Sequence, residues 1–341
     1  MNEFRHRQAA HCESGVVSSM LSHHGLPLSE PMAFGLASAM SFAYLPFIKI
    51  GGMPLIAYRM PPRWIIRRAS KRLGVRFVSK TFRNHKRGMD ALDRQLDAGQ
   101  IVGLQTSVFW LPYFPDEMRF HFNAHNLIVY GREGDEYLIS DPVFEEPVRC
   151  PAADLQRARF AKGALAARGL MYYPVKVPQR IDYERVIPAA IRTNEKIMAR
   201  APFPVLGVRG IRFLADNLIR TSKRSDARKR LPLYLAHIVR MQEEIGTGGA
   251  GFRFLYASFL QESAEQLDSR ALAEAAEALT AAGDRWREFA LAAARVSRKR
   301  SEMNIDELAD LLRDCATREA EVWQLLAQWQ ASDRLRDGAQ A

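Results

Sequence analysis

The sequence predicts an α+β fold, with a mixed N-terminal domain at residues 1–178 and an all-α domain at residues 179–341. A chain of 341 residues is long enough for about two domains of the usual ~150 residues. Up to about residue 175 helical patterns alternate with β-rich runs, whereas after Pro178 helical periodicity continues with almost no β-run. This change of pattern places the domain boundary near residue 178.

The elements of the N-terminal domain follow from periodicity and from the residues that begin and end helices. Cys12–His24 has the pattern of a short helix that Gly25 ends, and Ser29, Glu30 and Pro31 are typical of the start of a second helix. We expect this second helix to continue to about residue 44. Further helices are predicted at 62–73 and 89–98, a strand or loop at 48–58, and strands at 75–80, 101–109, 125–130, 137–140 and 169–177.

An excess of basic residues is the main feature of the composition. Lysine and arginine number 49 against 38 aspartates and glutamates, which gives a net charge of +11 and a pI near 9.8. Between Arg59 and Arg87 eleven residues are basic and none is acidic. Such a run fits a compact acidic partner, a phosphate-bearing cofactor or an RNA, and it is equally compatible with a solvated face that has no partner.

The cysteines and the N-terminus indicate the compartment. Cys12, Cys150 and Cys315 are too widely spaced for a zinc site or a disulfide framework. The N-terminal residues carry basic side chains without an apolar core behind them, so we expect no signal peptide. No apolar run is long enough for a membrane-spanning helix. These features predict a reduced, cytoplasmic protein.

Cys12 is the candidate nucleophile because it stands at the predicted start of the first helix. Helix N-terminal amides and the helix dipole lower the pKa of a thiol there and favour the thiolate. The same amides can donate to an oxyanion that forms on a carbonyl attacked by the sulfur. A buried structural thiol is the alternative, and its polar neighbours His11, Glu13 and Ser14 count against it.

His125 and Asp141 are the candidate partners of this nucleophile. His125 opens one predicted strand and Asp141 closes the next, so an antiparallel hairpin would bring the two side chains within reach. A carboxylate beside an imidazole fixes its tautomer and supports the imidazolium. A core histidine and a turn-forming aspartate before Pro142 are the alternatives. We expect no metal site, because His121 and His125 lie too far apart on a strand to chelate an ion easily.

An early cysteine, a histidine that opens a later strand and an acid that closes the following strand resemble the order of papain-like cysteine enzymes, including double-glycine bacteriocin-processing peptidases. The sequence is more specifically similar to the butirosin biosynthesis protein H family. The matching segments are His11-Cys12-Glu13-Ser14, Leu28-Ser29-Glu30 with Gly35 and Phe42, Leu111-Pro112-Tyr113, His125, Asp141-Pro142, residues 245–249 and residues 252–256. The resemblance implies a papain-like N-terminal domain with an all-α accessory domain.

The resemblance also implies an acyltransferase of specialised metabolism. Such an enzyme takes an acyl or aminoacyl group from the phosphopantetheine thioester of an acyl carrier protein, or from acyl-CoA, and transfers it through a cysteine to an amine. The phosphopantetheine belongs to the donor, so no tightly bound cofactor is expected. Carrier proteins are small and acidic, which makes the basic run a candidate docking surface. Its candidate residues are Arg63, Arg67, Arg68, Lys71 and Arg72.

The second oxyanion donor and the substrate pocket are the least determined parts of the site. Papain-like enzymes commonly carry a glutamine about six residues before the cysteine, whereas His6 stands there in this chain and Gln8 follows it. Gln8 is therefore a candidate donor. Ser14 is a candidate for capping the helix or contacting substrate. Tyr113, in the apolar segment 110–115, is a candidate for a flap that lines the acyl channel.

Other functions stay open at this point. A hydrolase (amidase, peptidase or thioesterase) would use the same three residues, and a carbon nucleophile in place of the amine would form a C–C bond. A non-catalytic module that binds a carrier protein or nucleic acid through the basic surface is a third possibility, with nucleic acid the less favoured partner. The acyl donor, the acceptor, the pathway and a homodimeric state are not determined by the sequence.

Overall fold

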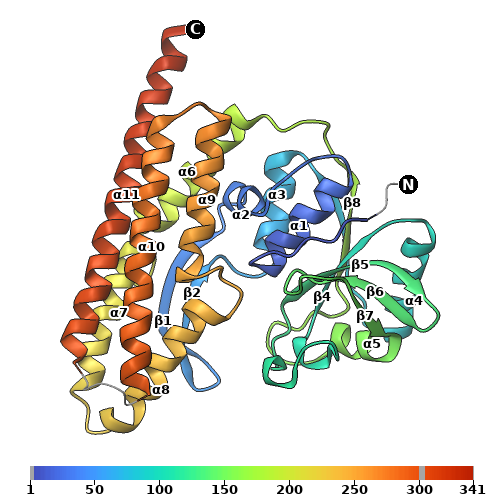
Figure 1. Cartoon of the computed structure of the whole chain (residues 1–341), viewed down its shortest axis with the longest axis horizontal. Helices are drawn as coiled ribbons and strands as arrows, with labels where there is room; N and C mark the ends of the chain where they lie inside the picture. The colour runs from blue at the N-terminus through green and yellow to red at the C-terminus, as the bar shows by residue number, and fades with distance from the viewer. Residues whose placement is uncertain (1–3, 299–303, 341) are drawn as a thin grey trace. The chain divides into compact units, whose positions relative to one another are not determined.

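The structure is a computed structural model that describes residues 4–298 and 304–340. It confirms the mixed α+β fold class. Contacts divide the chain into two compact units. Figure 1 shows the whole chain, coloured from the N-terminus to the C-terminus by residue number. The first unit is Met1–Ala33 with Pro62–Asp182, and the second unit is Phe34–Pro61 with Tyr183–Ala341. Residues 34–61 thus pack with the C-terminal helices. This division follows contacts and not the sequence, so the domain boundary near residue 178 stays a prediction.

An antiparallel sheet forms the frame of the first unit. Its strand order is β3-β8-β4-β5-β6-β7. The expected strands are confirmed with shifted ends, and β7 is an additional strand that the sequence analysis does not predict. The strands are β3 (Arg76–Lys80), β4 (Val102–Thr106), β5 (His125–Glu133), β6 (Glu136–Ser140), β7 (Val148–Pro151) and β8 (Met171–Lys176).

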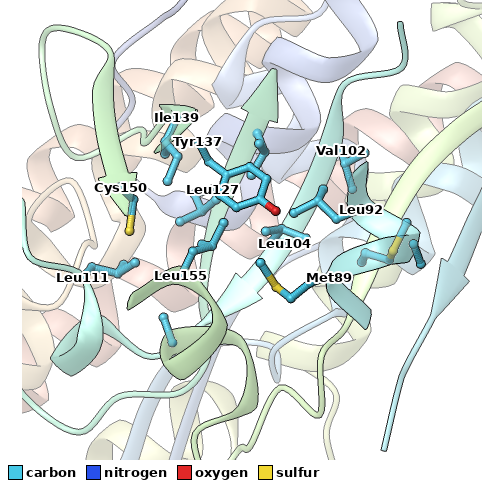
Figure 2. Packing of buried hydrophobic residues seen from close by; sticks show 14 of the residues in the cluster. Met89, Leu92, Val102, Leu104, Leu111, Leu127, Tyr137, Ile139, Cys150 and Leu155 are labelled. Carbon is cyan, nitrogen blue, oxygen red and sulfur yellow. The ribbon is translucent and has the colours of Figure 1, made fainter. Parts of the chain in front are cut away.

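Helices pack on both faces of this sheet. They are α1 (Cys12–His23), α3 (Trp64–Leu73), α4 (His85–Asp97) and α5 (Ala152–Phe160). α4 packs against β4 and β5, and α5 packs against β4 and β6. Figure 2 shows the hydrophobic core of this unit, with Met89, Leu104 and Leu127 among its members. Because side chains alternate along a strand, Leu127 points into this core while Asn126 points to the other face, where it contacts α1.

The segment after Glu30 differs from the expected helix. α2 (Glu30–Leu36) ends well before residue 44, and residues 40–50 form strand β1 (Met40–Ile50) instead, so the prediction of a longer helix is wrong. β1 pairs antiparallel with β2 (Met53–Arg59) across a turn at Gly51 and Gly52, which both have positive φ. An apolar run of this length fits a helix or a strand equally well by periodicity, and its pairing with β2 decides for the strand.

The second unit combines this hairpin with helices. The predicted helical character after residue 178 is confirmed, and α10 and α11 run side by side in Figure 1. No helix within the described residues is both long and apolar enough to cross a membrane. The helices are α6 (Tyr183–Met198), α7 (Gly207–Ser222), α8 (Ala227–Val239), α9 (Arg253–Gln266), α10 (Arg270–Ser297) and α11 (Ile305–Gln340).

A buried ion pair ties three helices of the second unit together. Arg253 and Glu319 are both 0% exposed, and the guanidinium donates to the carboxylate through Nε at 2.9 Å and through one terminal nitrogen at 3.1 Å. Trp286 Nε1 donates to the same carboxylate at 2.6 Å. This pairing offsets the cost of removing both charges from water, so loss of either partner would leave an uncompensated buried charge.

Candidate active site

Cys12 is the first residue of α1 and is half-buried. His11 precedes it in an extended conformation as the N-cap, and its Nδ1 accepts a hydrogen bond from the Ser14 amide at 3.3 Å. Cys150 and Cys315 are buried, and burial raises the pKa of the Cys150 thiol to about 12 and also raises that of Cys315. Of the three thiols, only that of Cys12 therefore combines a helix start with access to solvent.

Glu30 holds the segment that leads into Cys12. Its carboxylate accepts the amide of Ala10 at 2.8 Å and the amide of His11 at 2.7 Å. The Ser14 hydroxyl donates to the same carboxylate at 3.0 Å, and Ser14 is fully buried. Burial raises the pKa of Glu30, and the three donors oppose that rise. The Ser14 side chain is thus part of the support for the helix start.

Glu13 connects the same helix to α3. Its buried carboxylate accepts the backbone amides of Arg63 at 3.1 Å and Ile65 at 2.9 Å, so it satisfies donors at the start of α3. Gly15 lies one residue beyond Ser14, where an added Cβ would come within 2.5 Å of Ala9. These contacts fix the orientation of the turn that carries Cys12.

His125 and Asp141 meet at one end of the β5–β6 hairpin. The two strands pair antiparallel, and Nε2 of His125 lies 2.6 Å from Oδ2 of Asp141. The Tyr113 hydroxyl donates to that same oxygen at 2.9 Å, and Asp141 is 0% exposed. The sequence expectation that the hairpin brings the imidazole and the carboxylate together is confirmed.

The charge state of His125 follows from its surroundings. Burial by itself lowers the pKa of an imidazole, but the Asp141 carboxylate and Cys12 outweigh it and raise the pKa of His125 to about 10. A hydrogen bond joins the His125 side chain to Cys12. Since Asp141 engages Nε2, Nδ1 is the ring nitrogen available for the sulfur. The three side chains therefore form the contiguous series thiol, imidazole and carboxylate.

Gln8 and His6 contact residues next to Asp141 in the sequence. The Gln8 side chain is exposed, and its Nε2 donates to the Val143 carbonyl at 3.3 Å. His6 Nε2 donates to the Phe144 carbonyl at 3.0 Å, while its Nδ1 lies 2.7 Å from the Ser140 hydroxyl. Both side chains therefore donate to the segment that follows Asp141.

Asn126 is a polar side chain beside Cys12 that is not among the site residues expected from the sequence. It is 2% exposed, and its Nδ2 lies 3.9 Å from the Cys12 sulfur. One signal could have found it, because it is the only polar residue between His125 and Gly131 except the half-buried Tyr130. Glu30 is the other unexpected contributor, and its place at the start of α2 gives no sign that it reaches Ala10.

The segment 110–115 divides its side chains between the buried site and the surface. Phe114 packs edge-on against the His125 ring at 5.5 Å between centroids, and Tyr113 reaches Asp141. Burial, followed by the Asp141 charge, raises the pKa of Tyr113 well above its ordinary value, so the phenol stays a donor. On the outer side a hollow of about 400 Å³ is lined by Phe109, Trp110, Pro112, Asp116, Arg119, Asp154 and Arg157.

The candidate docking residues on and before α3 differ in exposure. Arg67 and Lys71 are exposed, whereas Arg68 and Arg72 are half-buried. The Arg63 guanidinium donates to Gln105 at 2.8 Å, so it also serves the packing of the first unit. Arg68 lies over the Trp64 ring at 4.9 Å. The exposed positive charge of α3 is therefore concentrated at Arg67 and Lys71.

Two family models match the chain in succession. The model described as butirosin biosynthesis protein H, N-terminal, matches residues 11–142, a range that contains Cys12, His125 and Asp141. The model described as a domain of unknown function, DUF4872, matches residues 153–326, which is half of the chain.

Other comparisons are weaker. No curated protein matches the chain. A crystal structure described as a C39-like peptidase from Bacillus anthracis is 17% identical with a TM-score of 0.37, over 51% of this chain and 95% of that one. This likeness is too distant to carry an argument.

Proposed function

The chain belongs to the DUF4872 family, whose model matches half of it, and its N-terminal part is similar to butirosin biosynthesis protein H. We propose that it is a papain-like cysteine acyltransferase of specialised metabolism. It moves an acyl or aminoacyl group from a carrier-protein or CoA thioester through a Cys12 acyl-enzyme to an amine or another nucleophile. The observation that carries this proposal is the series of side chains Cys12, His125 and Asp141, in which Cys12 stands at the start of α1 and its imidazole and carboxylate partners lie at the end of the β5–β6 hairpin.

The first half-reaction is a thioester exchange. The Cys12 thiolate attacks the thioester carbonyl, the new S–C bond forms, and the carbonyl electron pair moves to oxygen. When that pair returns, the bond to the pantetheine sulfur breaks, and His125 gives its proton to the departing thiolate. One thioester replaces another, so this step is nearly isoenergetic.

The second half-reaction consumes the acyl-enzyme. An amine attacks the Cys12 thioester, neutral His125 takes a proton from the nitrogen, and the Cys12 sulfur leaves as the thiolate that pairs with the imidazolium. Asp141 accepts a hydrogen bond from Nε2–H of His125 throughout, without taking the proton, and so holds the ring with Nδ1 toward the sulfur. An amide is the product, and no tightly bound cofactor takes part in this scheme.

The basic residues of α3 suit an acidic donor. Arg67 and Lys71 are exposed on one helix, in a run of sequence that contains no acidic residue. Opposite charges mainly accelerate the association of two proteins, and salt weakens the effect. An acyl carrier protein is therefore the proposed donor, and the acceptor is a small molecule.

Intact-mass spectrometry tests the acyl-enzyme directly. The protein is mixed with acyl-pantetheine, acyl-CoA and acyl-carrier-protein thioesters, and its mass should rise by that of one acyl group. Cys12→Ala should abolish this adduct, whereas Cys150→Ala, which removes a buried thiol, should retain it. An undiminished adduct on Cys12→Ala, or no adduct on the wild-type protein with any donor, would overturn the proposal.

A cysteine hydrolase is the alternative that the same residues support. The two functions differ in the fate of the acyl-enzyme, which a series of amines added to the preformed adduct would reveal. Release as amide supports the transferase, and release only as free acid at every amine concentration supports the hydrolase.

A non-catalytic binding module differs in the reactivity of Cys12. A nucleophilic Cys12 should be alkylated at pH ~6–7 much faster than an ordinary thiol, whose pKa is about 8.5. Equally slow alkylation of all three cysteines would favour a binding module.

A further inference from the structure

We propose that Asn126 is a catalytic residue that supplies the side-chain hydrogen-bond donor of the oxyanion site. This inference rests on the proposed function, because it assigns Asn126 to the carbonyl that Cys12 attacks. It replaces Gln8, the donor candidate suggested by the resemblance, whose Nε2 donates to the Val143 carbonyl.

The orientation of the Asn126 amide follows from its neighbours. Its Nδ2 lies 3.1 Å from the carbonyl oxygen of Ala124, which can only accept a hydrogen bond, so the amino group must face that carbonyl. The Oδ1 on the other side accepts from the Tyr172 hydroxyl at 2.9 Å. Burial raises the pKa of Tyr172 well above its ordinary value, so this donor stays protonated. The amide orientation is thus fixed from both ends.

The second N–H of the amide is directed at the reacting sulfur. Nδ2 lies 3.9 Å from Cys12 Sγ, which is a long contact for a hydrogen bond to sulfur in the free enzyme. The carbon that Cys12 attacks becomes bonded to this sulfur and carries the developing oxyanion. A donor at that range from the sulfur is therefore well placed to reach the oxyanion. Catalytic hydrogen bonds are often long without substrate and shorten in the complex.

The chemical character of Asn126 fits this role. A neutral amide donates at every working pH. Because Asn126 is only 2% exposed, its N–H stabilises the developing charge with little reorganisation of water. During attack the carbonyl electron pair moves to oxygen and the Asn126 N–H stabilises it. When the pair returns and the pantetheine sulfur leaves, His125 supplies the proton, so Asn126 itself transfers none.

Asn123 offers a matched control three residues earlier. It is a buried asparagine, 4% exposed, and its Nδ2 donates to the carbonyls of Ala164 and Lys162. Replacing either asparagine removes a buried amide from the same part of the first unit. Of the two, only Asn126 is adjacent to His125 in the sequence and contacts Cys12.

The experiment measures two rates on wild type, Asn126→Ala and Asn123→Ala. The first is alkylation of Cys12 by iodoacetamide as a function of pH, followed by peptide mass spectrometry. The second is single-turnover acylation by acyl-pantetheine at a pH where alkylation has reached its plateau. If Asn126→Ala does not fold, Asn126→Ser, whose hydroxyl is too short to reach the sulfur, takes its place.

We expect Asn126→Ala to slow acylation by about 10²–10³-fold at the alkylation plateau, the usual cost of one oxyanion donor. Alkylation should slow much less, because it creates no oxyanion, and Asn123→Ala should stay within about twofold of wild type in both. Acylation of Asn126→Ala at the wild-type rate, or equal losses in Asn123→Ala, would overturn the assignment. If the wild-type protein is alkylated rapidly but accepts no acyl donor, the proposed function fails, and the role of Asn126 fails with it. If only the role of Asn126 is wrong, the wild-type protein is still acylated.

Discussion

Nε2 of His125 lies 2.6 Å from Oδ2 of Asp141, although sixteen positions separate the two residues in the sequence. The β5–β6 hairpin produces this proximity, and Tyr113 adds a hydrogen bond to the same carboxylate oxygen. Asp141 thereby outweighs the burial of His125 and keeps its pKa near 10. The imidazolium is thus the form of His125 that stands beside the Cys12 sulfur at neutral pH.

Asp141→Asn tests this coupling through the pH profile. A raised pKa means that the pairing stabilises the fold fully below the ordinary histidine pKa of about 6.5, and that this stabilisation is lost as pH rises through about 10. The alkaline limb of single-turnover acylation should therefore lie near pH 10. Asp141→Asn removes the carboxylate charge but leaves His125 buried, so the alkaline limb of the acylation rate should move toward pH 6.5 or below. The maximal acylation rate should fall by about 10²–10⁴-fold.

Asp135→Asn is the control for that experiment. Asp135 lies in the turn of the same hairpin and its side chain is 85% exposed. Its profile should coincide with that of the wild-type protein. An unchanged alkaline limb in Asp141→Asn would show that the carboxylate does not set the pKa of His125.

Glu30→Gln tests the support of the helix start. The carboxylate accepts two backbone amides and the Ser14 hydroxyl, and a glutamine would turn its amino group toward one of these donors. We expect a loss of about 1–3 kcal/mol in the free energy of unfolding, measured by urea denaturation, because buried donors lose their acceptor. Acylation of Cys12 should slow by at least about tenfold, since a small misplacement of a reacting group is costly.

Glu133→Gln is a suitable comparison, because Glu133 pairs with Arg149 on the surface and exposed pairs contribute little. Its unfolding free energy should change by less than about 1 kcal/mol. A Glu30→Gln variant as stable and as fast as Glu133→Gln would mean that the carboxylate does not position Cys12.

Arg67→Glu/Lys71→Glu tests the docking of an acidic donor on α3. Acylation by a carrier-protein thioester should slow by about tenfold or more at low salt, because the charge reversal turns attraction into repulsion. The difference should shrink at high salt, where charges are screened. Acylation by acyl-pantetheine, which has no protein surface, should be unchanged.

A double reversal elsewhere controls for net charge. Arg228 and Lys229 are exposed on α8 of the second unit. If Arg228→Glu/Lys229→Glu slows the carrier-protein reaction as much as the α3 variant does, the effect belongs to the overall charge and not to a surface on α3.

Arg253→Met tests the buried ion pair of the second unit. It leaves Glu319 buried without its partner, so the free energy of unfolding should fall by about 3–5 kcal/mol in urea denaturation followed by circular dichroism. Arg253→Met/Glu319→Leu should recover a large part of this loss, because an apolar pair carries no uncompensated charge. Arg270→Met, which removes a surface pair with Glu274, should change stability by less than about 1 kcal/mol, and a similar loss in both single variants would contradict the prediction.

The sequence by itself determined the parts of this protein that depend on neighbouring residues. Periodicity and end signals located α1, so Cys12 could be placed at a helix start, and the alternating strands around a short turn located the hairpin that joins His125 to Asp141. The helical pattern after residue 178 likewise needed no knowledge of distant contacts. Local pattern suffices in these cases because each element forms its regular hydrogen bonds within a short stretch of chain.

The tertiary structure alone decided which distant groups meet. Residues 40–50 form a strand because β2 pairs with them. They belong to the second unit although the sequence on both sides of residues 34–61 belongs to the first. Glu30 reaches the amides before Cys12, and Asn126 reaches the sulfur, because folding sets which face of each element is covered and by what. Burial and long-range partners, which also set the pKa of His125, arise only when the whole chain is packed, so no local pattern encodes them.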